Sequence, residues 1–352
     1  MLVSLHIYFK LYFFENISLL EDIRLLLGGG VTLGSELKKT TLNNITVPKK
    51  RIKLIDKSVA PYVFSAPFII FYFVFLAFPI LFTFYMSMMN WTPFDTPIFI
   101  GFKNYVELFR DARFYKALSN AFILMAMIIP VQLSLGMFIA VALSGKQIKF
   151  KNTLRLFNFL PYLTTPVALG LLFAILFDPA FGYINMALKM IGLPQPDWIG
   201  RPWAARAMIA LVTVWRWSGY TGVILMTGIT NISDDIYEAC DIDGAIGWKR
   251  FFYITLPMIR PVIVFVALTT LIGCFQIFEE PLLLFSGGGS GRGLVGGPQG
   301  AALTGVWLMY DVGFGTIMRY GYGATICYGL FIAIGLVTVV FNRIVGIGRD
   351  NK

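Results

Sequence analysis

Residues 58–94 read SVAPYVFSAPFIIFYFVFLAFPILFTFYMSMMNWTPF and contain no charged side chain. A helix needs about 20 mostly apolar residues to cross the hydrocarbon core of a bilayer, which is about 30 Å thick. This stretch is long enough to cross it. Because helices and closed barrels are the structures that satisfy every backbone polar group in lipid, we expect an all-α membrane protein.

Further windows along the chain have the same character. Overall, 57% of the 352 residues are hydrophobic and 14% are charged, against about 45–50% and about 25% in soluble domains. The fourth window carries a single charge, Arg216, and the fifth ends with Glu279, Glu280 and the sequence PLLLF. We predict six membrane-spanning helices, at 62–89, 117–143, 156–177, 207–231, 262–285 and 320–342.

Lysine and arginine residues predict the orientation of these spans, because cytoplasmic loops retain positive charge. Fifteen such residues lie beside the spans on the side of the two termini, and nine lie on the opposite side. Both termini are therefore expected inside the cell. We predict a cytoplasmic N-terminal extension at 1–57, partly disordered or interfacial, a transmembrane domain at 58–345, and a cytoplasmic tail at 346–352.

Composition argues against several classes of function. Much of the net charge of +10 lies beside the spans, and no Lys/Arg tract is dense enough to indicate nucleic-acid binding. Three scattered cysteines do not form a disulfide framework, and one histidine, His6, argues against a His-based metal site or a Ser-His triad. No G-x-x-x-x-G-K-[ST] motif occurs in the sequence. The chain therefore does not bind ATP in the P-loop manner, and any pumping must draw energy from elsewhere.

Two local patterns modify the picture of plain spans. The segment GFKNYVELFRDARFYKALSN (101–120) predicts an amphipathic helix at the outer interface. Pro161 and Pro166 lie inside the third predicted span, where kinks are tolerated if neighbours satisfy the freed backbone groups. The residues at helical spacing among the charges of 101–120 are Phe102, Tyr105, Leu108 and Phe109.

A polar stretch, YEACDIDGAIGWKRFFYITLP (237–257), separates the fourth and fifth spans on the predicted cytoplasmic side. Ser233-Asp234-Asp235 is a helix-capping sequence, with Glu238 as the capping-box partner of Asp235. Gly244 is expected to end this first short helix, and Pro257 to end a second one before the fifth span. We predict a compact two-helix elbow, residues 233–257, with small residues at its tip.

The order of residues in this elbow resembles the EAA loop of permease subunits in binding-protein-dependent ABC importers. In that family the loop supplies the coupling helix that sits in a groove of the ATPase, so the resemblance implies docking on a partner ATPase. Cys240 stands where an alanine is usual, and since both residues are small we expect docking to survive. The residues to which the resemblance assigns ATPase coupling are Glu238, Ala239, Cys240, Asp243, Gly244, Ala245, Phe251, Leu256 and Pro257.

The resemblance covers about residues 58–345. Within the family, the chain is similar to the carbohydrate-uptake branch, on its maltose-type first-permease side. It rests there on segments such as TGVWLMYDVGF (304–314). It implies a transport subunit, not an enzyme, in the prokaryotic cytoplasmic membrane, which moves a sugar or oligosaccharide, acidic ones included, by alternating access. The implied partners are a second homologous permease, two ABC ATPase subunits that bind ATP and Mg²⁺, an extracytoplasmic solute-binding protein and the lipid bilayer. No cofactor is expected on this chain and no nucleic acid among its partners.

Polar and aromatic side chains inside spans are candidates for a substrate pathway, because the membrane penalises them unless they face a cavity or a partner. For Arg216 the alternative is a structural ion pair, with Glu279 and Glu280 as candidate counter-charges. Aromatic rings can stack on sugars and polar groups can bind hydroxyls; Gln132, Thr164 and Thr269 offer hydrogen bonds of this kind. The candidate pathway residues are Trp215, Arg216, Trp217, Tyr220, Gln276 and Thr165.

Two other functions stay open at this point. An ion-coupled secondary transporter of a polar solute would need an internal repeat and ionisable residues near the midplane, and only Arg216 is placed deeply. A membrane-embedded enzyme, such as a glycosyltransferase, would need clustered carboxylates. The acidic cluster of the elbow offers these, but a helix start and the permease motif account for most of its members, which are Asp234, Asp235, Glu238, Asp241 and Asp243.

Overall fold

The structure is a computed structural model that describes residues 60–145, 149–285, 295–315 and 318–345. The chain divides into two units, Met1–Phe68 and Ile69–Lys352. The first unit contributes the start of helix α2 (Ala60–Tyr72) to the described residues, and every later element belongs to the second unit. The predicted extension at 1–57 and the predicted tail at 346–352 lie outside the described residues.

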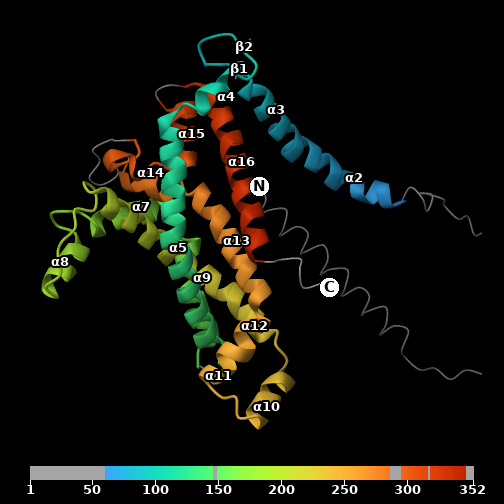
Figure 1. Ribbon diagram of the computed structural model, residues 1–352, viewed down its shortest axis with the longest axis vertical. Helices are drawn as coiled ribbons and strands as arrows, with labels where there is room; N and C mark the ends of the chain where they lie inside the picture. Colours follow the sequence, from blue (N-terminus) through green and yellow to red (C-terminus); the bar gives the residue numbers. More distant parts are fainter. Residues whose placement is uncertain (1–59, 146–148, 286–294, 316–317, 346–352) are drawn as a thin grey trace, which may run out of the picture. The chain divides into compact units, whose positions relative to one another are not determined.

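Two long helices, α5 (Ala112–Ser144) and α9 (Pro202–Thr230), pack along one another at the centre of the second unit (Figure 1). Asp111 caps α5, since its side chain accepts a hydrogen bond from the backbone N–H two residues on at 2.8 Å. A side chain at Gly136 would collide with Thr221 across the interface. Glycine therefore allows the two backbones to approach closely, as is common between helices in lipid.

The third predicted span, 156–177, is not one continuous helix but a broken pair of helices. The chain forms α6 (Lys151–Leu163) and α7 (Pro166–Leu176), which are bent by 90° at the break. Thr164 and Thr165 between them are extended. Two effects explain the break: a residue before proline avoids the helical conformation, and the proline nitrogen has no hydrogen to donate.

The last third of the unit surrounds α5 and α9. Helix α13 (Arg260–Gln276) packs against α5, α9 and α16 (Tyr320–Val345), and α15 (Gly305–Phe314) packs against α16. After a two-residue break the chain continues from α13 into the short helix α14 (Glu279–Phe285), which packs on α7. Because of the break, the first turn of α14 does not continue the last turn of α13.

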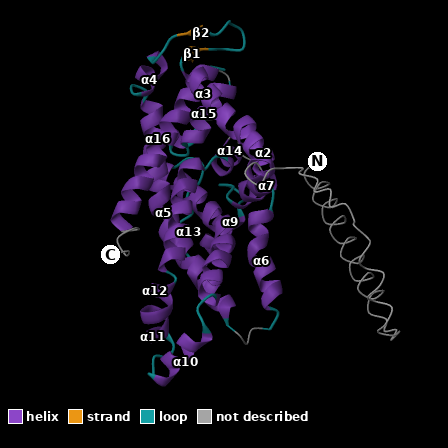
Figure 2. Cartoon of the chain, turned by 90° about the vertical axis from the view of Figure 1, so that its right-hand side faces the viewer, coloured by secondary structure: helices purple, strands orange, loops and turns teal. Residues whose placement is uncertain are grey.

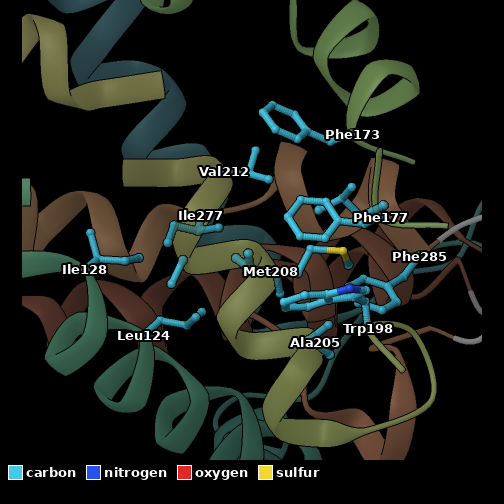
Figure 3. Close-up of a cluster of buried hydrophobic side chains, with 14 of the residues drawn as sticks. Leu124, Ile128, Phe173, Phe177, Trp198, Ala205, Met208, Val212, Ile277 and Phe285 are labelled. Atoms are coloured by element: carbon cyan, nitrogen blue, oxygen red, sulfur yellow. The ribbon is translucent and has the colours of Figure 1, made fainter. Parts of the chain in front are cut away.

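The largest cluster of buried apolar side chains joins α7, α9 and α14 (Figure 3). Phe177 meets Trp198 edge to face, with ring centroids 4.9 Å apart. The indole N–H of Trp198 donates to Asn185 of α8 (Tyr183–Met190) at 2.8 Å, so its polar atom is satisfied. Because lipid is as apolar as this cluster, close packing rather than exclusion of water holds these helices together.

Five of the predicted spans coincide with helices that are long and apolar enough to cross a membrane, and the bent pair α6–α7 is the sixth candidate. The first of the five consists of α2, a π-helical turn (Phe73–Ala77) and α3 (Phe78–Ser87). The helices Pro61–Ser87, Ala112–Ser144, Pro202–Thr230, Arg260–Phe285 and Tyr320–Val345 correspond to the predictions 62–89, 117–143, 207–231, 262–285 and 320–342.

The segment predicted as one amphipathic helix is divided. After a hairpin of two short antiparallel strands, β1 (Met89–Asn90) and β2 (Ile98–Phe99), the chain forms only a six-residue helix, α4 (Lys103–Leu108). The amphipathic helix predicted within 101–120 is therefore limited to α4, because Asp111 caps α5 and makes the rest of that segment the start of a span.

Figures 1 and 2 show the hairpin and α4 at one end of the second unit, and helices α10 to α12 at the opposite end. If the long helices cross a bilayer, these two ends lie on opposite sides of it. The orientation with both termini inside stays a prediction. The elements of the second end are α10 (Asp234–Ile242), α11 (Trp248–Arg250), a π-helical turn (Phe251–Thr255) and α12 (Leu256–Met258). Elsewhere in the chain, between α14 and α15, a short 3₁₀ turn is found at Pro298–Gly300.

Candidate functional site

A cavity of about 590 Å³ lies between α5, α9, α13 and the start of α14. Its aromatic wall is formed by Trp217 and Tyr220 of α9. Tyr162 of α6 stacks on Tyr220 with ring centroids 5.0 Å apart, and it meets Trp217 edge to face at 5.1 Å. The first half of the bent pair thus braces the ring faces that the cavity presents, which favours a fixed geometry for stacking on a flat ligand.

The polar part of the lining is held by a buried glutamine. Gln132 of α5 donates from Nε2 to the hydroxyl of Thr221 at 2.9 Å and to that of Thr270 at 3.4 Å. These bonds connect α5 to α9 and α13. Thr269 and Gln276 of α13 also line the cavity and are exposed within the chain, so they can offer hydrogen bonds to a ligand.

Arg216 lies at the edge of the same cavity, in an ion-pair network with the first two residues of α14. Its Nη1 donates to Glu279 Oε2 at 2.9 Å and to Glu280 Oε1 at 3.0 Å. The expected counter-charges are therefore confirmed. The pairing is possible because the break after Gln276 lets the first turn of α14 approach α9.

The structure brings four of the six predicted pathway residues together. Arg216, Trp217, Tyr220 and Gln276 line the cavity, whereas Trp215 and Thr165 do not. Trp215 points to the other side of α9, where it packs edge to face on a phenylalanine of α7, and Thr165 lies in the extended break before α7. Contact of any of them with a substrate stays a prediction.

Several lining residues were missed from the sequence: Thr221, Thr270 and Gly273. Helical spacing contained a signal for two of them, because Thr221 follows Trp217 by four positions and Gly273 follows Thr269 by four. Residues four apart lie on one face of a helix. That spacing does not reveal which face looks into a cavity, and this depends on the packing of three helices.

The elbow begins with α10, whose end follows the prediction closely. Gly244 has φ +72° and follows the last helical turn. Its N–H donates to Asp241 O at 3.3 Å, and the N–H of Ala245 donates to Cys240 O at 2.8 Å. This pair of bonds is the Schellman motif, which satisfies the last carbonyls of a helix and favours glycine at the left-handed position.

The start of α10 and the end of the second arm differ from the prediction. Ser233 is the N-cap residue, and its side chain makes no cap hydrogen bond. Because α10 begins at Asp234, Asp235 already lies inside the helix and cannot be the N-cap residue. The predicted capping box of Asp235 with Glu238 is therefore wrong. Pro257 does not end the second arm but lies inside α12. The π-helical turn just before it accommodates the missing N–H, and the helix ends at Met258 instead.

Arg250 ties the two arms of the elbow together. It donates to Asp241 Oδ1 at 3.0 Å, and its guanidinium lies 5.3 Å from the centre of the Tyr237 ring. The hydroxyls of Tyr237 and Thr255 are 3.4 Å apart. These contacts link α10 to the second arm at several points.

The residues assigned to ATPase coupling lie mostly at the surface of the elbow. Cys240 is buried, which fits a small residue that packs inside. The end of the unit is also strongly apolar: Ile242 is 87% exposed, and Trp248 and Tyr253 are each 77% exposed. Such a patch is typical of a surface that a partner or a membrane covers. Glu238, Ala239, Asp243, Gly244 and Pro257 are exposed, and Ala245, Phe251 and Leu256 are partly buried.

At the opposite end, an ion pair joins α4 to the residues before α16. Arg319 donates two hydrogen bonds to the carboxylate of Glu107, at 2.6 and 2.8 Å. These bonds hold the pKa of Glu107 below its ordinary value of 4.5, against the opposing effect of partial burial. The pair fixes α4 against the start of α16.

The chain is similar in sequence to known transport permeases and in fold to a solved transporter. The chain is 33% identical over 296 residues to the arabinooligosaccharides transport system permease protein AraP of Bacillus subtilis, which covers 83% of this chain and 90% of the relative. It is 30% identical over 279 residues to the lactose transport system permease protein LacF of Rhizobium radiobacter, covering 79% of this chain and 91% of the relative. The fold is similar to that of a bacterial alginate ABC transporter crystallised with an alginate pentasaccharide-bound periplasmic protein. That match has a TM-score of 0.65 and 20% identity, and it covers 82% of this chain and 95% of the other.

The model of one protein family, described as the binding-protein-dependent transport system inner membrane component, matches residues 106–350. This range includes the cavity, the elbow and all helices from α5 onward. The chain is thus an all-α, multi-pass protein of the inner membrane, and it belongs to the family of binding-protein-dependent transport system inner membrane components.

Proposed function

We propose that this chain is one permease half of an ATP-driven importer that carries a sugar or short oligosaccharide across the cytoplasmic membrane. Relatives that share most of its length are named for the transport of arabinooligosaccharides and lactose. The cavity supports the proposal, because braced aromatic rings beside hydrogen-bonding side chains suit the flat faces and hydroxyls of a sugar. The ion-coupled transporter is not favoured, since the family is a binding-protein-dependent transport system.

The connection between elbow and cavity is the observation that carries this function. Helix α9, which holds Arg216, Trp217 and Tyr220, ends at Thr230, just before the elbow. The second arm of the elbow runs into α13, which holds Gln276. A displacement of the elbow therefore acts on two walls of the cavity at once, as alternating access requires.

The proposal assigns the remaining parts of the importer to other chains. A second, homologous permease completes the pathway, and an extracytoplasmic solute-binding protein delivers the sugar at the end that carries the hairpin. Two ATPase subunits, which bind ATP and Mg²⁺, dock at the elbows of the two permeases. Closure of the ATPase pair then draws the elbows together and turns the cavity from inward-facing to outward-facing.

Cross-linking tests the docking. Single cysteines at the exposed positions Trp248 and Tyr253 are expected to form cross-links with the ATPase subunit in the assembled importer. A cysteine at Met190 of α8, which is 81% exposed, serves as the control and is expected to form none. If the elbow cysteines react with lipid only, the assignment of the elbow to an ATPase fails.

Reversal of one charge tests the coupling itself. Glu238 is exposed on α10 and makes no salt bridge within the part of the chain that the structure describes. Glu238→Lys is therefore expected to leave the fold intact but to separate ATP hydrolysis from sugar uptake, measured together in proteoliposomes. Full uptake by this variant would count against the role of the elbow.

A further inference from the structure

The cavity has an unusual charge for a site that contains an arginine. Among the described residues that line it, three carry a formal charge: Arg216, Glu279 and Glu280. One positive and two negative charges leave the lining with a formal charge of −1. An arginine in a sugar site invites the interpretation that it binds a carboxylate, since its planar fork matches that group. The contacts of this arginine point the other way.

Arg216 is already committed to its two glutamates. Its Nη1 donates to both of them, at 2.9 and 3.0 Å, and its side chain is only 12% exposed. Its Nε is buried and has no hydrogen-bond partner among the described residues. An anionic ligand that approaches this arginine therefore meets two carboxylates that already pair with its Nη1.

Glu279 supplies the charge that a ligand meets. Its side chain is 49% exposed, whereas that of Glu280 is 10% exposed. A half-exposed carboxylate beside Gln276 accepts hydrogen bonds from sugar hydroxyls, and it repels a second carboxylate. The other polar lining residues are uncharged at neutral pH, so nothing else in the described lining compensates this repulsion.

We infer that the cavity admits saccharides without a carboxylate and rejects acidic ones, and that Glu279 is the residue that sets this preference. The inference rests on the proposed function and narrows its substrate class, because acidic oligosaccharides were among those that the sequence left open. It concerns charge alone and applies to any neutral sugar that fits the aromatic wall of Trp217 and Tyr220.

The first experiment asks which sugars the full importer takes up. Bacteria with and without this chain receive a mixture of oligosaccharides from arabinan, galactan, homogalacturonan and glucuronoxylan, and mass spectrometry follows their loss from the medium. Loss that depends on the chain is expected for neutral species only. Equally fast loss of uronate-bearing species would overturn the inference while leaving the proposed function intact. Loss of none would overturn the proposed function, and the inference with it.

The second experiment assigns the preference to Glu279. The best neutral sugar and its C6-oxidised uronate form a matched pair of probes for binding to the purified importer without its solute-binding protein, so that selection by that protein does not interfere. Glu279→Gln keeps the pair of Arg216 with Glu280 and removes the excess charge, and Glu279→Asp is the control that keeps it.

Coulomb's law sets the expected size. For one unit charge about 8 Å away, at effective dielectric constants of about 60 to 20, removal of the charge raises the relative affinity for the uronate by about threefold to thirtyfold. Glu279→Gln is expected to show this change, and Glu279→Asp is expected to keep the wild-type ratio. An unchanged ratio in Glu279→Gln, or an equal change in both variants, would overturn the role of Glu279.

Discussion

At the scale of single residues, Gly219 shows how tightly the cavity wall is built. It lies on α9 between Trp217 and Tyr220, where a Cβ atom would collide with the backbone carbonyl oxygen of Asn158 on α6. A backbone carbonyl cannot rotate away as a side chain can. The glycine therefore sets the distance between the aromatic wall and the helix that braces it.

Gly219→Ala is expected to push α6 away from α9 and to lower the melting temperature of the purified importer. Gly335→Ala is the matched control, because the space around that glycine, in α16, is empty within 4 Å. Alanine at an open helical site stabilises a helix by up to about 1 kcal/mol, so the control is expected to be neutral or slightly more stable. Equal melting temperatures for the two variants would contradict the close contact between α6 and α9.

Acid is expected to remove the contribution of the pair between Glu107 and Arg319. Because the pKa of Glu107 is lowered in the folded protein, the pair stabilises the fold above the ordinary pKa of 4.5, and this is lost as the pH falls through the lower, folded-state value. The effect is small, below about 1 kcal/mol, since the pair is partly exposed. Thermal unfolding of wild type and Glu107→Gln should differ at pH 7 and converge in acid. A difference that persists unchanged at the lowest pH would contradict it.

At this scale, sequence reasoning identified Arg216 as a residue that needs compensation. It named Glu279 and Glu280 as candidate partners but could not show that they reach the arginine. An arginine in the middle of a span costs about 2.5–3.5 kcal/mol on insertion scales, which required compensation and made Glu279 and Glu280 candidates. A straight helix would have carried both glutamates toward the membrane edge. The break after Gln276, which hydropathy does not register, is what brings them to the arginine.

At the scale of elements, the elbow was predictable where its turns depend on particular residues. Gly244 marked the end of α10, and the structure places it in the left-handed conformation that the prediction needs. The interior of the second arm was not predictable. A π-helical turn shifts the hydrogen bonds before Pro257, so the helix runs one residue past that proline and ends at Met258.

Gly244→Val is expected to strain this turn. A non-glycine residue in the left-handed conformation costs about 1–2 kcal/mol, and a β-branched side chain is among the least tolerant. We expect normal membrane insertion but more ATP hydrolysed per sugar imported, measured in proteoliposomes. Gly244→Asn is the control, since asparagine accepts this conformation more readily and should retain most of the coupling. Equal coupling in both variants would show that the turn does not transmit force.

The sharp bend in the third predicted span was not predictable for a related reason. Its mean composition was that of a span, and the two extended threonines before Pro166 change that composition very little. The proline indicated a kink, but it did not indicate a bend of 90°. Whether a kink becomes a 90° turn depends on the helices that receive α7, here α14, and those contacts are not encoded near the proline.

At the scale of the whole molecule, the limits of five long helices followed closely from the sequence, because lipid imposes one simple requirement on every span. The cavity did not follow, because it is assembled from faces of α5, α9 and α13 that meet only after folding. Its polar residues were recognisable one by one as costly in a membrane. Their common position was visible only in the packed structure.

The two ends of the second unit should face opposite sides of the membrane. A cysteine at Asp95, in the exposed hairpin loop, is expected to react with an impermeant maleimide added to spheroplasts, whose cytoplasmic membrane is intact. A cysteine at Lys249, on the exposed elbow, should react only after permeabilisation. Both are placed in a background in which Cys240, Cys274 and Cys327 are replaced. The reverse pattern would overturn the orientation derived from the positive charges.

The network of Arg216 with two glutamates has a consequence for the evolution of such chains. Codons for glutamate and glutamine differ by a single base, so one point mutation at position 279 neutralises the excess charge. Since Glu280 alone still pairs with Arg216, such a mutation leaves the buried guanidinium compensated. The formal charge of the cavity lining can thus change in one genetic step, without any rearrangement of the helices around it.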